Sequence, residues 1–191
     1  MSAASPPESA RRDELLERAY EYVLAHGLAG ISLRPLAAAV GSSPRVLLFL
    51  FGSKDGLVRA LLARARAQET ELLARPPGEG GAAAAGLRVW TWLAADEHRG
   101  LLRLWVESYA RSLIDPVGPW DEFARETVDD WLALLAAAQP ASIRETEAAV
   151  AERTLVLAVL RGAMLDLLAT GDRERTTRAV RDCLVPLRRR S

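Results

Sequence analysis

Residues 31–57 have the sequence ISLRPLAAAVGSSPRVLLFLFGSKDGL, which predicts two short helices joined by a tight turn. Ser32 is placed to cap the first helix, because apolar residues at helical spacing follow it. Gly41 is expected to end this helix, since glycine readily takes the left-handed conformation found at helix ends. Ser43 then caps the second helix and puts Pro44 at its first position, where proline is favoured. Together the two helices form one helix-turn-helix unit.

The local chemistry of this unit predicts its caps and its partner. Pro35 falls at the third position of the first helix, where a missing amide is tolerated. The Ser32 hydroxyl is therefore expected to accept a hydrogen bond from the amide of Arg34. Ser53 is expected to cap a third helix over residues 54–68. A glycine turn between two helices this short is typical of units whose second helix lies in the DNA major groove. Double-stranded DNA is the partner that this layout predicts.

The first third of the chain is similar to the TetR family of bacterial transcriptional regulators. The similarity runs from RRDELLERAYEYVLAHG, residues 11–27, through the helix-turn-helix to FGSKDGL, residues 51–57. The resemblance implies a homodimer with a three-helix DNA-binding domain, here residues 1–57. It also implies a larger helical ligand-binding and dimerisation domain, here residues 58–191, with the helix over residues 54–68 linking the two.

One part of the motif departs from the family. Where the family usually has one or two tyrosines and a histidine, this chain has Leu48, Phe49 and Leu50. These side chains cannot donate hydrogen bonds to phosphates, which supply much of the affinity for DNA. Either Leu48 and Phe49 pack inside with only Leu50 exposed, or an apolar side chain meets a thymine methyl. The expected DNA-binding residues are Ser32, Arg34, Ser42, Ser43, Pro44, Arg45, Val46, Phe49 and Lys54, with Ser43, Arg45 and Val46 nearest the base edges.

Length and composition limit the remaining possibilities. At 191 residues the chain is long enough for one or two domains with a substantial core. Basic and acidic side chains number 25 each, so no global field draws the chain to nucleic acid. Residues 1–66 hold nine basic and six acidic side chains, an excess of the sign that DNA binding needs. Cys183 is the only cysteine, which fits a reduced cytoplasmic setting. A soluble cytoplasmic protein without membrane association is expected.

Beyond the motif, apolar residues recur at spacings of three and four, so an all-α fold is expected. The proline- and glycine-rich residues 75–81 are expected to form a hinge between the two domains. Further helices are expected over residues 82–97, 100–114, 120–138, 142–170 and 173–188.

Aromatic residues on three of these helices are candidates for an effector pocket. Small-molecule pockets are mostly apolar and aromatic with a few polar groups, although tryptophan at helical spacing is also typical of an ordinary core. The expected effector is a small apolar or aromatic molecule, and no cofactor or metal is indicated. The expected pocket residues are Trp90, Trp105, Ser108, Tyr109, Trp120, Phe123, Thr127, Trp131 and Arg161.

Residues 155–168 are apolar on nearly all sides, which predicts burial from more than one direction. A four-helix interface between two subunits would cover these faces, as the family resemblance also implies; an ordinary monomer core is the alternative. A dimer suits DNA with two symmetric half-sites. The expected interface residues are Leu155, Val159, Gly162, Ala163, Val180, Cys183, Leu184 and Leu187.

Catalysis is not indicated. His26 and His98 lack the Glu-x-x-His spacing of di-iron helical bundles, and the sequence has no Cys-x-x-Cys, phosphate-binding glycine loop or serine elbow. The sequence therefore predicts a regulator, by family habit a repressor, whose dimer releases its operator when a ligand binds. The alternative is a helical ligand-binding protein of the same fold with weak or lost DNA binding.

Overall fold

The computed structural model describes residues 8–28, 30–73 and 80–188, and all regular structure within these ranges is helical. This confirms the all-α fold expected from the sequence. Two short 3-10 helices, η1 (Asp96–His98) and η2 (Gly118–Trp120), precede α6 and α7. The α-helices are α1 (Glu8–His26), α2 (Leu33–Ala39), α3 (Pro44–Phe51), α4 (Lys54–Leu73), α5 (Gly81–Leu93), α6 (Arg99–Ile114), α7 (Phe123–Ala137), α8 (Glu147–Thr170) and α9 (Arg173–Arg188).

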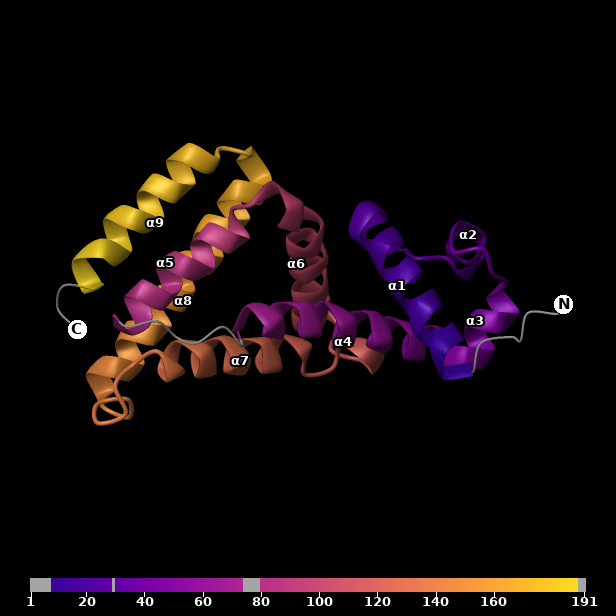
Figure 1. Cartoon of the computed structure of the whole chain (residues 1–191), viewed down its shortest axis with the longest axis horizontal. Helices are drawn as coiled ribbons and strands as arrows, with labels where there is room; N and C mark the ends of the chain where they lie inside the picture. Colours follow the sequence, from indigo (N-terminus) through magenta and orange to yellow (C-terminus); the bar gives the residue numbers. More distant parts are fainter. Residues whose placement is uncertain (1–7, 29, 74–79, 189–191) are drawn as a thin grey trace, which may run out of the picture.

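The first four helices share a hydrophobic core at one end of the molecule (Figure 1). Leu36 of α2, Leu47 of α3 and Leu61 of α4 are almost completely buried there. Burying a leucine side chain stabilises a fold by about 1.5–3 kcal/mol, so these contacts hold the short α2 and α3 in place. Leu101 and Leu104 of α6 belong to the same core. The amino-terminal unit is thus packed directly onto a helix of the carboxy-terminal half.

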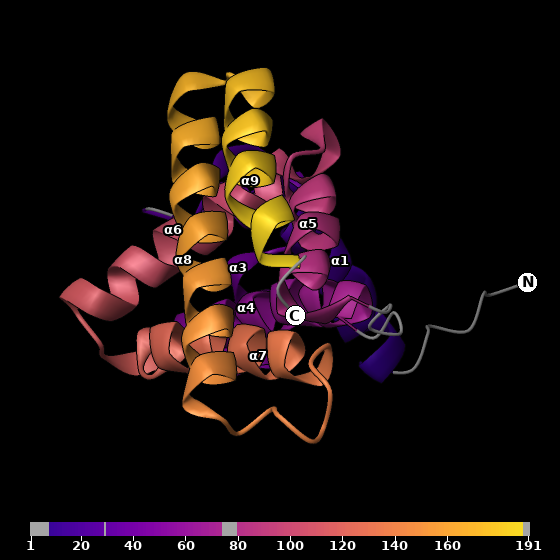
Figure 2. The ribbon, with the colours of Figure 1, turned by 90° about the vertical axis from the view of Figure 1, so that its left-hand side faces the viewer.

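A second core fills the opposite end, where α5, α8 and α9 run beside one another (Figure 2). Trp90, Val156 and Leu184 meet there almost without exposure to solvent. The helices approach one another closely at Gly86, because a Cβ atom at this position would lie 2.5 Å from Cγ1 of Val156. Trp131 and Leu135 attach α7 to the same core.

Two contacts join the ends of the molecule. The start of α6 approaches the end of α1 so closely that a Cβ atom at Gly100 would lie 2.7 Å from the carbonyl oxygen of Leu24. Close by, the amide of Leu28 donates to Oε2 of Glu107 on α6 at 2.8 Å. Along the lower edge in Figure 1, α4 runs beside α7. Movement of α6 or α7 would therefore be felt by the first core.

Several helix limits differ from those expected. The helix expected over 142–170 begins at Glu147, because the Thr146 hydroxyl caps it by accepting from the amide of Ala149 at 3.3 Å. The turns ahead of it are held by the buried amide of Gln139, which donates to the carbonyl of Ala149. The helix expected over 82–97 ends earlier, at Leu93, and η1 follows it; the helix expected over 120–138 begins later, at Phe123, after η2. The helix expected over 54–68 extends to Leu73 as α4.

Of the expected hinge, residues 75–79 lie outside the described part of the chain, and Gly81 already begins α5. Among the described helices, none combines the length and the hydropathy that crossing a membrane requires.

Candidate nucleic-acid interface and candidate effector cavity

The helix-turn-helix unit has the geometry that its caps predict, with one exception. Ser43 caps α3 by accepting from the amide of Val46 at 3.3 Å, and Ser53 caps α4 by accepting from the amide of Gly56 at 2.9 Å. Gly41 between α2 and α3 has φ +67°, which an L side chain rarely adopts. The exception is Ser32, whose side chain makes no capping hydrogen bond. The prediction that the Ser32 hydroxyl accepts from the Arg34 amide was therefore wrong.

The outer face of α3 carries Arg45 and Phe49, four residues apart and both exposed. Phe49 is 72% exposed, whereas Leu50 packs partly against the first core. The expectation that Leu48 and Phe49 pack inside and leave only Leu50 exposed was therefore wrong. Leu47 and Phe51 occupy the buried side of the helix instead, so the three apolar substitutions fall partly on the surface.

Other residues expected at the interface are divided by their burial. Ser32, Arg34 and Lys54 are exposed, while Pro44 and Val46 are partly buried. Ser42 does not fit, because its hydroxyl oxygen is buried and has no hydrogen-bond partner among the described residues. Its side chain is closed off from a DNA backbone in this arrangement.

The sequence segment that holds α2 and α3 carries side-chain charge of a single sign. No acidic residue occurs between Glu21 and Asp55, while Arg34, Arg45 and Lys54 lie within that segment. The three cations are exposed. Exposed positive charge in a segment without acidic residues favours contact with phosphates, even though the whole chain has zero net charge.

A small cavity, partly open to solvent, lies between α5, α6, α7 and α8. Its free volume is about 20 Å³, which is room for about one water molecule. Three of the expected pocket residues, Trp105, Trp131 and Arg161, line it. The Arg161 guanidinium lies over the rings of Trp105 and Tyr109, with its central carbon 5.5 and 4.9 Å from their centroids. The remaining lining residues are Leu93, Leu102, Leu157, Leu160 and Met164.

The other expected pocket residues are engaged elsewhere. Trp90 donates its indole N–H to the Thr177 hydroxyl of α9 at 3.0 Å. The hydroxyls of Ser108 and Thr127 donate to backbone carbonyls of their own helices. Trp120 and Phe123 pack against the first core. These five residues are not brought to the cavity.

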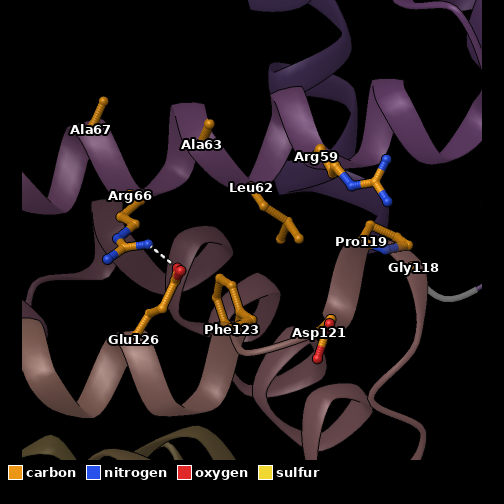
Figure 3. A pocket seen from close by; sticks show the side chains of 10 residues that line it. All are labelled: Arg59, Leu62, Ala63, Arg66, Ala67, Gly118, Pro119, Asp121, Phe123 and Glu126. Carbon is orange, nitrogen blue, oxygen red and sulfur yellow. Dashed lines mark hydrogen bonds and ion pairs between the residues drawn. The ribbon is translucent and has the colours of Figure 1, made fainter.

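A wide groove that the sequence did not predict lies between α4 and the η2–α7 segment (Figure 3). The groove has a volume of about 720 Å³ and is crossed at one end by Arg66, which pairs with Glu126 and Asp130 of α7. The hydrogen bond to Asp130 is the main reason that the pKa of Arg66 lies above its usual value. In the sequence, the four-residue spacing of Glu126 and Asp130 places both carboxylates on one face of a helix, and this spacing could have indicated a shared cationic partner.

The expected dimer-interface residues also divide by burial. Val180 and Leu184 have no exposed surface, because they pack inside the subunit against the second core; assigning them to an interface was wrong. Cys183 and Leu187 of α9 are partly buried. Along α8, Leu155 is 44% exposed and Gly162 is open to solvent, while Val159 and Ala163 are partly buried. The exposed residues Ala151, Leu155, Ala158, Gly162 and Leu165 form a stripe that we call the α8 face.

No known family profile and no curated protein matches this sequence. Among solved structures, it is similar to a TetR-family transcriptional regulator from Rhodococcus sp., with 19% identity over 94% of this chain and 99% of that one and a TM-score of 0.74. A TetR transcription regulator from Haloarcula marismortui shows 18% identity over 91% and 94% of the two chains, with a TM-score of 0.73. The multidrug binding protein EbrR complexed with imidazole shows 24% identity over 96% and 95%, with a TM-score of 0.65. The chain therefore has the fold of TetR-family transcriptional regulators.

Proposed function

We propose that this protein is a DNA-binding transcriptional regulator, a homodimer that represses transcription and releases its operator when a small apolar or aromatic molecule binds. The observation that carries the proposal is the outer face of α3, where Arg45 and Phe49 stand exposed within a segment free of acidic residues. Arginine is the residue that most often pairs with guanine in the major groove, and an apolar side chain can contact a thymine methyl.

The proposal includes a dimer because two recognition helices can then read two symmetric half-sites. Two recognition helices must stand one turn of DNA apart to bind two half-sites. The α8 face supports a symmetric contact, because its small and apolar residues are exposed in the single chain and lie on the far end from α3 (Figure 1). The proposed dimer interface therefore consists of Leu155, Gly162 and the other residues of the α8 face.

In this proposal the route from effector to DNA runs through α6. The cavity is walled partly by α6, and the same helix supplies Leu101 and Leu104 to the first core and Glu107 to the end of α1. A ligand that favours another position of α6 would change the spacing of the two α3 helices. Release of the DNA then needs only that the ligand binds the arrangement with displaced α6 more tightly than the arrangement that binds DNA.

Fluorescence anisotropy tests the DNA-binding part of the proposal. The probe is a labelled duplex from the region upstream of the protein's own gene, compared with a scrambled duplex over a series of salt concentrations. Specific affinity should exceed that for the scrambled duplex and fall steeply with salt. Arg45→Ala should weaken specific binding by about 10- to 100-fold, the cost of a lost base contact. Arg103→Ala removes an exposed arginine of α6 and serves as the control.

A second candidate function is a ligand-binding protein of this fold without DNA activity. The observation that favours it is the absence of hydrogen-bond donors at Leu48, Phe49 and Leu50 on the face of α3. In that case Arg34→Ala and Arg45→Ala would leave every measurable function intact. A signal that is independent of salt, or equal for both duplexes, would count against specific repression.

A further inference from the structure

Two residues that line the cavity, Trp105 and Arg161, carry hydrogen-bond donors that nothing in the described chain satisfies. Nε and Nη2 of Arg161 and Nε1 of Trp105 are buried and have no hydrogen-bond partner among the described residues. The third guanidinium nitrogen, Nη1, donates to the hydroxyl of Tyr109 at 3.2 Å. Buried polar groups are nearly always hydrogen-bonded, so three unsatisfied donors in one place call for an explanation.

The charge of Arg161 is also unbalanced. No carboxylate within the described ranges forms an ion pair with it, and its close neighbours are the rings of Trp105 and Tyr109. Cation–π contacts of this kind offset only part of the cost of removing a guanidinium from water. The site therefore has a positive charge, unused N–H groups and no acceptor.

The remaining walls determine what kind of molecule could provide the acceptor. Leu102, Leu157, Leu160 and Met164 are apolar, and Trp131 adds a flat ring. Nε and Nη2 form one edge of the planar guanidinium, which suits the two oxygens of a carboxylate. Methionine adapts its shape readily, so this wall can yield to a ring.

We propose that the effector is an organic acid with a flat aromatic or apolar body, held by its carboxylate. The carboxylate accepts from Nε and Nη2 of Arg161 and from Nε1 of Trp105, and the body lies among the leucines and Met164. This inference rests on the proposed function only in taking the cavity as the effector site. Because the free volume is about 20 Å³, such a ligand must separate α6 from α8 to enter. Binding is thereby linked to a displaced α6.

Isothermal titration calorimetry on the full chain tests the ligand class without DNA. The probes are benzoate and naphthoate, their neutral carboxamides, and benzylamine as the cation. The carboxylates should bind about tenfold more tightly than the amides, because charge-assisted bonds are about twice as strong as neutral ones, and benzylamine should not bind. Equal affinity for carboxylate and amide, preference for the amine, or no binding of either acid would overturn the proposal.

Variants assign the preference to the named residues. Arg161→Gln should bind carboxylate and amide alike, and Trp105→Phe should weaken the carboxylate severalfold while keeping a ring in the wall. Arg103→Gln, an exposed arginine of α6, should behave as wild type. Arg161→Gln should melt no lower than wild type, since it removes a partly buried charge that has no ion-pair partner among the described residues. A retained preference for carboxylate in Arg161→Gln would refute the assignment.

The DNA assay separates this proposal from the broader one. Specific DNA binding without carboxylate binding would overturn the ligand class alone. Carboxylate binding without specific DNA binding would overturn the regulator and leave the ligand class standing.

Discussion

Ser32 and Ser43 occupy equivalent positions ahead of consecutive helices, yet only Ser43 forms a capping hydrogen bond. Ser43→Ala should therefore lower the free energy of unfolding by about 1 kcal/mol, the usual cost of a lost cap. Ser32→Ala serves as the matched control and should stay within about 0.5 kcal/mol of wild type, as is usual for a surface change. Urea unfolding at one protein concentration measures the free energy of unfolding of both variants. The slope of that free energy against urea concentration should be the same as in wild type. Equal losses would contradict the difference between the two caps.

Phe49 offers a test by gain of function. Its ring is 72% exposed on α3, so Phe49→Tyr should leave the melting temperature unchanged. The added hydroxyl can donate to a phosphate, which is the role that the resemblance implies for the tyrosine usual at this place. A net hydrogen bond of about 1 kcal/mol corresponds to roughly fivefold tighter DNA binding. The salt dependence should not change, because no charge is added. Unchanged affinity in the anisotropy assay would remove this side chain from the interface.

At the scale of helices, Gly86 controls the crossing of α5 with α8 and α9. A Cβ atom there would lie 2.5 Å from Cγ1 of Val156 and 3.1 Å from Cδ1 of Leu184, both fully buried. Gly86→Ala should therefore destabilise the protein by about 1–3 kcal/mol through overpacking. Helix propensity alone predicts the opposite sign, a gain of about 1 kcal/mol. The direction of the change in thermal unfolding decides between them.

The connection between α8 and α9 should respond to acid. The hydrogen bond from Arg175 lowers the pKa of Asp166 below its usual value, so folding is favoured while the carboxylate is ionised. This contribution is fully present above the unfolded-state pKa of about 3.9 and is lost as the pH falls through the lower folded-state pKa. The difference in melting temperature between wild type and Asp166→Asn should therefore be present at neutral pH and shrink in acid. Asp182→Asn, at an exposed carboxylate of α9, is the control.

The helix limits that the sequence predicted correctly depend on local chemistry. Ser43 and Pro44 set the start of α3, because a cap and a first-turn proline act within one turn of helix. Thr146 was missed as the start of α8, since Ser142 and Thr146 are both acceptable caps and the local sequence does not choose between them. The cavity was predicted only in part for a similar reason. Which face of α5 meets α9, and so where Trp90 points, is decided by packing between helices far apart in sequence.

At the scale of the whole molecule, the position of α6 ties the proposed parts together. It contributes Leu102 and Trp105 to the cavity and Leu101 and Leu104 to the first core. Residues that face the cavity and the first core thus alternate along a single rigid helix. An effector that displaces α6 would move the base of the DNA-binding unit with no flexible element in between. A nearly filled cavity is therefore compatible with a regulatory role. In the proposal, the arrangement described here, in which α6 closes the cavity, is the one that would bind DNA, and the ligand would favour the arrangement with α6 displaced.

Dimerisation is the property of the whole molecule that a single exposed side chain can test. Leu155 is 44% exposed on the α8 face, so Leu155→Arg should leave one chain folded with an unchanged far-ultraviolet circular dichroism spectrum. In a symmetric interface the substitution would bury two arginines without partners, one from each subunit, because each subunit contributes the same residue. Sedimentation should then show a monomer where wild type shows a dimer. Specific DNA binding should fall by about 100-fold or more, since two half-sites no longer bind as one unit.

Ile114→Arg makes the same change at a residue that is 82% exposed at the end of α6 and should leave the dimer intact. A dimer that survives Leu155→Arg but not Ile114→Arg would move the interface from α8 to the end of α6.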